Sequence, residues 1–251
     1  VHGSRGLGDV YKRQSQDTFM RRYDFNDDTS LKSTISATRT IDNRYYRVEA
    51  SDRQSLLASD KTLNEPTVLP SIFYEKTEKG WRGNQKFRTE LSAVQLDNDQ
   101  GHDMARWSGI FEVAEDFELP LGIANYEANV TGNYYSIHTK PDSAVTKLGD
   151  FSFVNPALSV GWRLPIAAVG ANRTAILEPQ ARLAFIGGKD RTSIIPNRDA
   201  SDYRIDEANL FLLNRYQGKD YILPGTRADI GITATTNDNF FGDVFGLSLI
   251  H

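Results

Sequence analysis

The sequence predicts an all-β fold, an antiparallel up-and-down meander of about ten or eleven strands that forms an incomplete part of a large transmembrane β-barrel. Three observations indicate this. Apolar and polar residues alternate with a period of two along most of the chain, and the apolar spacing of three and four that marks helices is essentially absent. Asp, Asn and Gly clusters separate the alternating runs, as turns do between antiparallel strands.

Each expected strand is a run of about ten residues bounded by polar turn residues. In chain order they cover residues 18–25, 30–41, 44–56, 71–77, 86–96, 105–119, 126–134, 156–165, 175–185 and 226–236. Pro66 and Pro70 bracket the start of the fourth run, where a missing backbone N–H is tolerated. The strand at 126–134 has the clearest alternation. A meander of this length with open edges favours closure into a barrel.

A membrane barrel explains these strands better than a soluble sandwich does. Crossing a bilayer at a tilt takes about nine to eleven residues, whereas sandwich strands usually have five or six. Charged and polar side chains such as Arg88 and Glu90, or Gln180 and Arg182, line one face of whole strands, as a wet lumen permits. Aromatic residues near the strand ends are typical of the interfacial girdles of such barrels. The predicted location is the outer membrane of a Gram-negative cell.

The two ends of the chain differ from the rest. Residues 4–14 read SRGLGDVYKRQ and residues 247–251 read LSLIH. Both are translations of one adapter used in transposon-based sequencing libraries, in opposite orientations. We therefore expect 1–14 and 247–251 to be non-native, and 15–246 to be the middle part of a barrel from a longer gene.

Composition excludes several functions. The chain has 29 Lys and Arg against 33 Asp and Glu and carries no basic patch with interleaved aromatics, which argues against nucleic-acid binding. It has no cysteine, so neither a disulfide nor a thiolate metal site is expected. His102 and His138 lack a second histidine at ligand spacing, and the loop 97–101 lacks the glutamate of a calcium loop. We expect no catalytic residues, metal or cofactor, and hence no enzyme.

One block stands out from the repeated strand pattern. A strand carries the triplet L-E-P, a polar loop carries I-P-N, and a second strand-like segment reads D-x-N-L-F-x-x-N-R. The positions are Leu177, Glu178, Pro179, Arg182, Ile195, Pro196, Asn197, Asp206, Asn209, Leu210, Phe211, Asn214 and Arg215. Alternation places Glu178 and Arg182 on the lumen side. Arg163 on the neighbouring strand, together with Arg227 and Asp229, could extend them into a charge network that stiffens the interior.

This block resembles the C-terminal barrel of the LptD family of lipopolysaccharide (LPS) assembly proteins. Phe19–Phe25, which reads F-x-R-R-Y-D-F, resembles a strand end of the alphaproteobacterial branch, and Leu69-Pro70, 156–165 and 214–218 are supporting matches. The resemblance covers most of residues 17–236. It implies an outer-membrane barrel that receives LPS from a periplasmic Lpt bridge protein and, in many species, holds a plug lipoprotein of the LptE type.

The resemblance further implies that this piece lacks the seam strands through which the lipid leaves for the outer leaflet. It would form barrel wall, in contact with LPS and outer-membrane lipids. Two other classes fit the strand pattern alone: another outer-membrane barrel, such as a porin or a TonB-dependent receptor, and a soluble all-β binding domain.

Overall fold

A computed structural model describes residues 30–55, 67–97, 102–139, 148–170, 173–191, 193–197, 199, 209–216, 218–238 and 244–250. Strands are the regular secondary structure of these described residues. The strands are β1 (Ser30–Ile41), β2 (Arg44–Ser55), β3 (Thr67–Lys79), β4 (Lys86–Asp97), β5 (His102–Leu119), β6 (Gly122–Thr139), β7 (Gly149–Arg163), β8 (Ile166–Val169), β9 (Arg173–Ile186), β10 (Gly225–Asp238) and β11 (Val244–Ile250). Among the described residues, no helix has the length and apolar character needed to cross a membrane.

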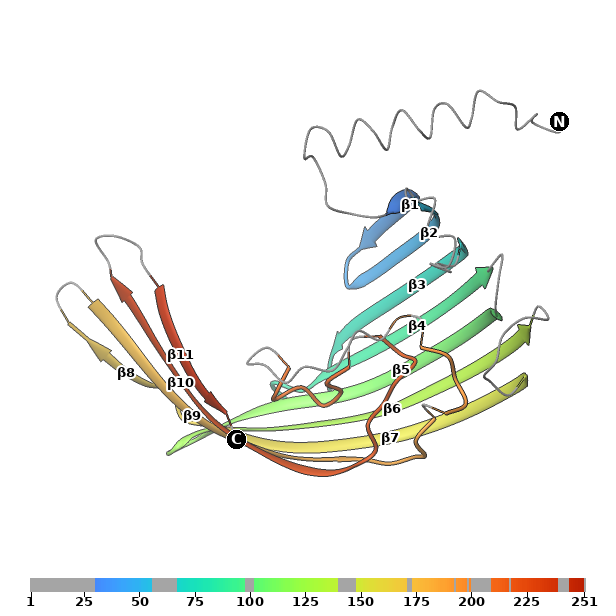
Figure 1. Cartoon of the computed structure of the whole chain (residues 1–251). Coiled ribbons are helices and arrows are strands. Elements are labelled where there is room, and N and C mark those ends of the chain that lie inside the picture. The colour runs from blue at the N-terminus through green and yellow to red at the C-terminus, as the bar shows by residue number, and fades with distance from the viewer. Residues whose placement is uncertain are drawn as a thin grey trace.

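The strands form one eleven-stranded antiparallel sheet in chain order, from β1 to β7 and then β9, β10 and β11. Each strand pairs with the next, so the sheet is an up-and-down meander, and it curves into an open trough with β1 and β11 at its two edges (Figure 1). The predicted fold class, part of a large barrel, is confirmed. β11 includes residues 247–250, which the adapter match predicts to be non-native, and the native boundaries 15–246 stay a prediction.

The two ends of the sheet carry connections of different lengths. Residues 42–43, 80–85 and 120–121 make short turns at one end of the sheet. The opposite end carries the short connection 98–101, the longer connections 56–66 and 140–148, and above all 187–224 between β9 and β10. The described parts of this last connection lie on the concave side of the trough, across β4 to β7 (Figure 1). We call residues 187–224 the inner loop.

The L-E-P triplet interrupts the hydrogen-bond ladder. β7 and β8 pair with β9 in one continuous register, from Ala157 opposite Ile186 to Val169 opposite Thr174. At the interruption, the Leu164 N–H donates to the Pro179 carbonyl at 3.0 Å. Proline has no N–H, so no return bond from residue 179 can form. β7 and β8 are therefore one long strand with a ladder gap at Pro179.

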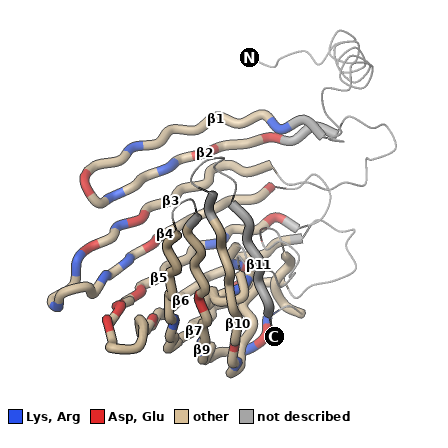
Figure 2. The backbone as a smooth tube through the Cα atoms, turned by 90° about the vertical axis from the view of Figure 1, so that its left-hand side faces the viewer, with Lys and Arg blue, Asp and Glu red and all other residues tan. Residues whose placement is uncertain are grey.

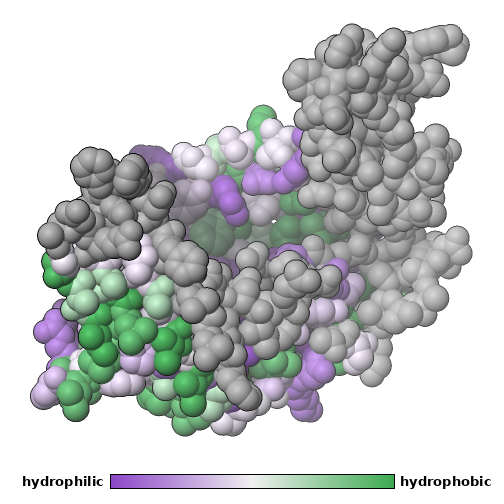
Figure 3. Space-filling view, turned by 60° about the vertical axis from the view of Figure 1, so that its left-hand side comes forward, coloured by the Kyte–Doolittle hydropathy of each residue, from purple (hydrophilic) through white to green (hydrophobic). Residues whose placement is uncertain are grey.

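The two faces of the sheet differ as a membrane barrel requires. Large apolar side chains on the convex face are exposed, among them Leu158, Val160, Leu177, Leu183, Phe185, Ile230 and Ile232. Buried polar and charged side chains lie on the concave face, among them Glu90, Arg106, Ser108, Asn133, Ser159 and Asp229. Figure 3 shows apolar side chains gathering on one face of the molecule, and Figure 2 shows that charges of both signs recur along the strands. In water this arrangement would be inside out.

The observed elements differ from the expected ones in strand length and in one segment of the inner loop. Most strands are longer than the predicted ten residues, and β5 and β6 reach 18 residues each. The strand predicted over the D-x-N-L-F-x-x-N-R segment is wrong, since its described part, residues 209–216, forms turns and irregular backbone. Asp206, Phe19–Phe25 and the loop 98–101 lie outside the described residues.

Candidate functional site: the contact between barrel wall and inner loop

The strongest polar contacts of the described chain join the inner loop to the strands that it covers. At their centre is Arg106 on β5, whose Nη1 donates to Asp220 Oδ1 at 2.6 Å and to Asp199 Oδ2 at 2.5 Å. Both carboxylates belong to the inner loop. The Asp220 side chain is 0% exposed, so its charge depends on these partners. The Tyr135 hydroxyl on β6 also donates, to the Lys219 carbonyl at 3.1 Å and to Asp220 Oδ1 at 3.3 Å.

The two loop carboxylates also organise the loop backbone. Asp199 Oδ1 accepts from the Lys219 N–H at 3.0 Å and from the Asp220 N–H at 3.1 Å, while the Asp199 N–H donates to Asp220 Oδ2 at 3.2 Å. Gly218 makes room for this arrangement, because with φ at +99° a Cβ there would lie 2.5 Å from the Asp199 carbonyl oxygen. A single wall arginine therefore fixes two loop segments that lie 21 residues apart.

The protonation of Asp199 is set by this cluster. Burial by itself raises the pKa of the Asp199 carboxyl, but Arg106 and the N–H groups of Lys219 and Asp220 outweigh it and hold the pKa below its ordinary value. A carboxyl whose pKa is depressed in the docked state stabilises that state above its ordinary pKa, and the contribution is lost as the pH falls through the depressed value.

We therefore expect the inner loop to stay docked from neutral pH down to about pH 4, the ordinary range of an aspartate, and to loosen below it. A spin label at exposed Leu223, three residues from Asp220, in the full-length protein would report this as a rise in mobility. The Asp199→Asn variant should show a smaller acid step. A loop that loosens already between neutral pH and pH 5 in the unsubstituted protein would contradict the assignment.

Lys219 extends the contact to β4. Its Nζ forms an ion pair with Glu90, and Glu90 Oε2 also accepts from Arg88 Nη1 at 2.8 Å. Arg88 Nη2 donates in turn to Glu112 on β5 at 3.1 Å. Charges of alternating sign thus run from the loop across two strands of the wall.

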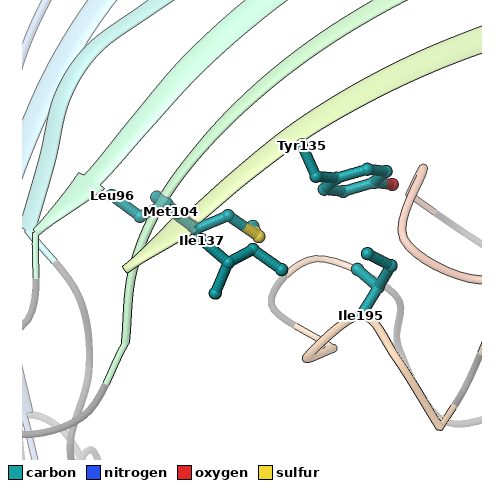
Figure 4. Packing of buried hydrophobic residues seen from close by; sticks show 5 residues of the cluster. All are labelled: Leu96, Met104, Tyr135, Ile137 and Ile195. Carbon is teal, nitrogen blue, oxygen red and sulfur yellow. The ribbon is translucent and has the colours of Figure 1, made fainter. Parts of the chain in front are cut away.

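An apolar contact lies beside the charged one. Ile195 of the I-P-N triplet is buried against Leu96, Met104, Tyr135 and Ile137 from β4, β5 and β6, as Figure 4 shows. Arg191 is fully buried next to them, 5.1 Å from the Phe153 ring centroid and 5.9 Å from that of Tyr135. Desolvation lowers the pKa of the Arg191 guanidinium. Leu213 and Ile222 form a second buried cluster with Ala157, Ala184 and Ile186 of β7 and β9.

Three arginines explain why the N-L-F segment forms a turn and not a strand. The Leu210 carbonyl accepts from Arg215 Nε at 3.1 Å and Nη2 at 3.0 Å, and the Phe211 carbonyl accepts from Arg182. Arg227 Nη2 donates to the carbonyls of residues 212 and 213. Guanidinium groups thus take the place of the neighbouring-strand N–H groups that these carbonyls would otherwise need. We call residues 210–213 the carbonyl turn.

The arginines of the carbonyl turn are themselves anchored in the wall. Arg182 Nη2 donates to Glu127 on β6 and to the Ser159 hydroxyl on β7, both at 2.5 Å. Asp229 on β10 forms ion pairs with Arg215 and, at 3.1 Å, with Arg227. The Arg215 and Asp229 side chains are both nearly buried. The wall therefore holds the turn through charged bonds from three different strands.

The sequence-derived charge network is divided in the structure. Arg163 and Glu178 face each other at 3.5 Å, with side chains 40% and 24% exposed. Arg182, Arg215 and Arg227 instead bind the carbonyl turn, and Asp229 pairs with Arg215 and Arg227. Leu177 lies on the exposed convex face, Pro179 at the ladder gap, and Pro196 and Asn197 after buried Ile195. Asn214 accepts from the Tyr216 N–H at 3.3 Å, and Asn209 begins the turn.

Sequence reasoning missed Arg106, Tyr135, Asp199, Lys219 and Asp220. Alternation along β5 and β6 does put Arg106 and Tyr135 on the concave side, so a search of inward-facing residues would have found them. Nothing local marks the loop partners, since Arg106 is 114 residues from Asp220 and 93 from Asp199.

A cavity of about 260 Å³ remains between the inner loop and the wall. Its lining combines charged groups, amides and apolar side chains, including Arg88, Glu112, Glu127, Asn155, Lys219 and Ile222. Because the cations among them already face carboxylates, the cavity suits neutral hydroxyl-rich groups or water better than a free anion.

Comparison with known proteins agrees with this architecture. No curated protein sequence matches the chain. A family model described as "LptD: LPS transport system D" matches residues 8–248. This range includes the whole inner loop and all the strands except the last two residues of β11. With a meander of long strands, an apolar convex face and a polar concave face, the chain belongs to the LptD family.

Proposed function

We propose that this chain forms part of the wall of an outer-membrane translocon that inserts LPS into the outer leaflet. The LptD family takes part in LPS transport and is a family of outer-membrane proteins, which supports the proposal. The single observation that carries it furthest is the two-sided sheet, because lipid and a water-filled passage are the two environments that its faces match. Its partners would be LPS, outer-membrane lipids, a periplasmic Lpt bridge protein and an LptE-type plug lipoprotein.

The lengths of the connections support an orientation. Outer-membrane barrels have short turns on the periplasmic side and longer loops on the outside. By this rule the turns at 42–43, 80–85 and 120–121 face the periplasm, and the inner loop starts and ends at the cell surface. The inner loop then folds back into the passage from outside, where its contacts with β4 to β7 narrow the space available to the sugar head of LPS.

The proposal predicts what loss of the full-length protein does in its host. Depletion should keep newly made LPS from reaching the outer leaflet, so labelling of LPS at the surface of intact cells should fall as the protein disappears. Re-expression of the full-length gene should restore it, while re-expression of an unrelated barrel should not.

The same experiment separates the alternatives. A porin or a TonB-dependent receptor would show lower uptake of small solutes or chelated iron on depletion, with surface LPS unchanged. That outcome would overturn the proposed function. A soluble binding domain would leave the protein in the periplasmic extract in place of the membrane fraction.

A further inference from the structure

Two glycines face each other on the convex face without a backbone reason to be there. Gly109 on β5 pairs directly with Gly132 on β6. Neither has a positive φ, a Cβ at Gly132 would meet nothing within 4 Å, and one at Gly109 would meet only Leu91 Cδ2, at an ordinary 3.4 Å. Glycine weakens a strand interior, and it often marks a place where a ligand approaches the backbone closely.

The glycine pair is the floor of a groove on the lipid-facing surface. Trp107 and Tyr134 form one wall, with ring centroids 5.9 Å apart. The next outward-facing pair along the two strands, Phe111 and Val130, does not line the groove. Leu91 and Val154 lie at the two ends, across the neighbouring strands. The groove encloses about 660 Å³, and none of the described residues that line it is charged.

We propose that this groove holds an acyl chain of LPS in the outer leaflet. It is continuous with the exposed apolar side chains of the convex face, so in the membrane an acyl chain is what reaches it. A largely apolar lining without a charged residue fits an acyl chain and offers no cation to a phosphate. Trp107 is 60% exposed and Tyr134 lies beside it, a pair of the kind that settles where the hydrocarbon meets the headgroups.

The position along the strands assigns the leaflet. Trp107 is the sixth of the 18 residues of β5 and Tyr134 the thirteenth of the 18 of β6, so both lie in the half of the sheet that carries the longer connections. In the orientation given above this is the outer half of the membrane. The choice of LPS over other lipids rests on the proposed function, whereas the existence of a lipid site does not.

The test is native mass spectrometry of the full-length protein released from nanodiscs of LPS and phosphatidylethanolamine. We expect the unsubstituted protein to retain one LPS molecule that Gly132→Leu loses, because the leucine side chain fills the groove. Val130→Leu is the matched control, two residues away on the same face of β6, and should retain LPS. Gly132→Ala fills less of the groove and should lower the retained fraction without abolishing it.

Equal LPS retention by the unsubstituted protein and Gly132→Leu would overturn the proposal. Retention of phosphatidylethanolamine alone by the unsubstituted protein would also overturn it, as would a Gly132→Leu variant that loses a bound protein and not a lipid. If Gly132→Leu fails to fold, Gly132→Ala decides, since its Cβ meets nothing within 4 Å. Full retention by Gly132→Ala would then count against the site. Failure here leaves the depletion result untouched, so the two proposals fail separately.

Discussion

Replacing Arg106 with methionine should release the inner loop. The change leaves Asp220, which is fully buried, and Asp199 without their shared cation. Removing one partner of a buried charged cluster costs about 3–5 kcal/mol, because the remaining charge stays desolvated. Hydrogen exchange of the amides of residues 218–222 in the full-length protein measures the free energy of opening of this segment, and that free energy should fall by the stated amount.

Arg163→Met is the matched control for this change. It removes the same side chain from the same face of the sheet, but its partner Glu178 is 3.5 Å away and both are partly exposed. Exposed pairs contribute about 0–1 kcal/mol, so the inner loop should open as in the unsubstituted protein. Adding Asp220→Asn to Arg106→Met should recover part of the loss, since one stranded charge is removed. Equal effects of the two arginine changes would show that Arg106 is not the anchor.

The sequence alone predicts the sheet well, for a physical reason. A strand between lipid and lumen must alternate, so residues such as Val130 and Asn133 on β6 reveal their faces locally. The register then follows from the turns. The sequence also shows where the prolines lie. The ladder gap at Pro179 can be predicted only once residue 179 is known to lie opposite Leu164.

The inner loop could not be predicted in the same way. Its described segments have no period, because their backbone groups bond to individual side chains of the wall and of the loop itself, or to nearby loop carbonyls, and not to a neighbouring strand. The motif N-L-F-x-x-N-R suggested a strand through its apolar residues. Those residues are buried as Leu210 and Leu213 within a turn whose carbonyls face arginines. Wall contacts from Arg182 and Arg227, together with Arg215 five residues along the chain from Leu210, hold that turn.

Replacing Asp229 with asparagine should free the carbonyl turn. Asp229 is the carboxylate between Arg215 and Arg227, and the Arg215 side chain is nearly buried. The asparagine keeps the shape but leaves two guanidinium groups close together without a counter-charge, at an expected cost of about 3–5 kcal/mol. The amides of residues 209–216 should exchange faster by the corresponding factor, while those of residues 218–222 should change less.

Glu178→Gln on the adjacent strand makes the same isosteric loss of charge at a partly exposed pair, and it should cost less than about 1 kcal/mol. A double-mutant cycle with Arg215→Met separates two roles of that arginine, which also donates to the Leu210 carbonyl. Contacting residues couple by about 0.5–3 kcal/mol, whereas independent ones add. Additive effects would mean that the carbonyl bonds alone hold the turn and that Asp229 acts elsewhere. Strong coupling would mean that Arg215 can bind the Leu210 carbonyl only because Asp229 holds its guanidinium group in place.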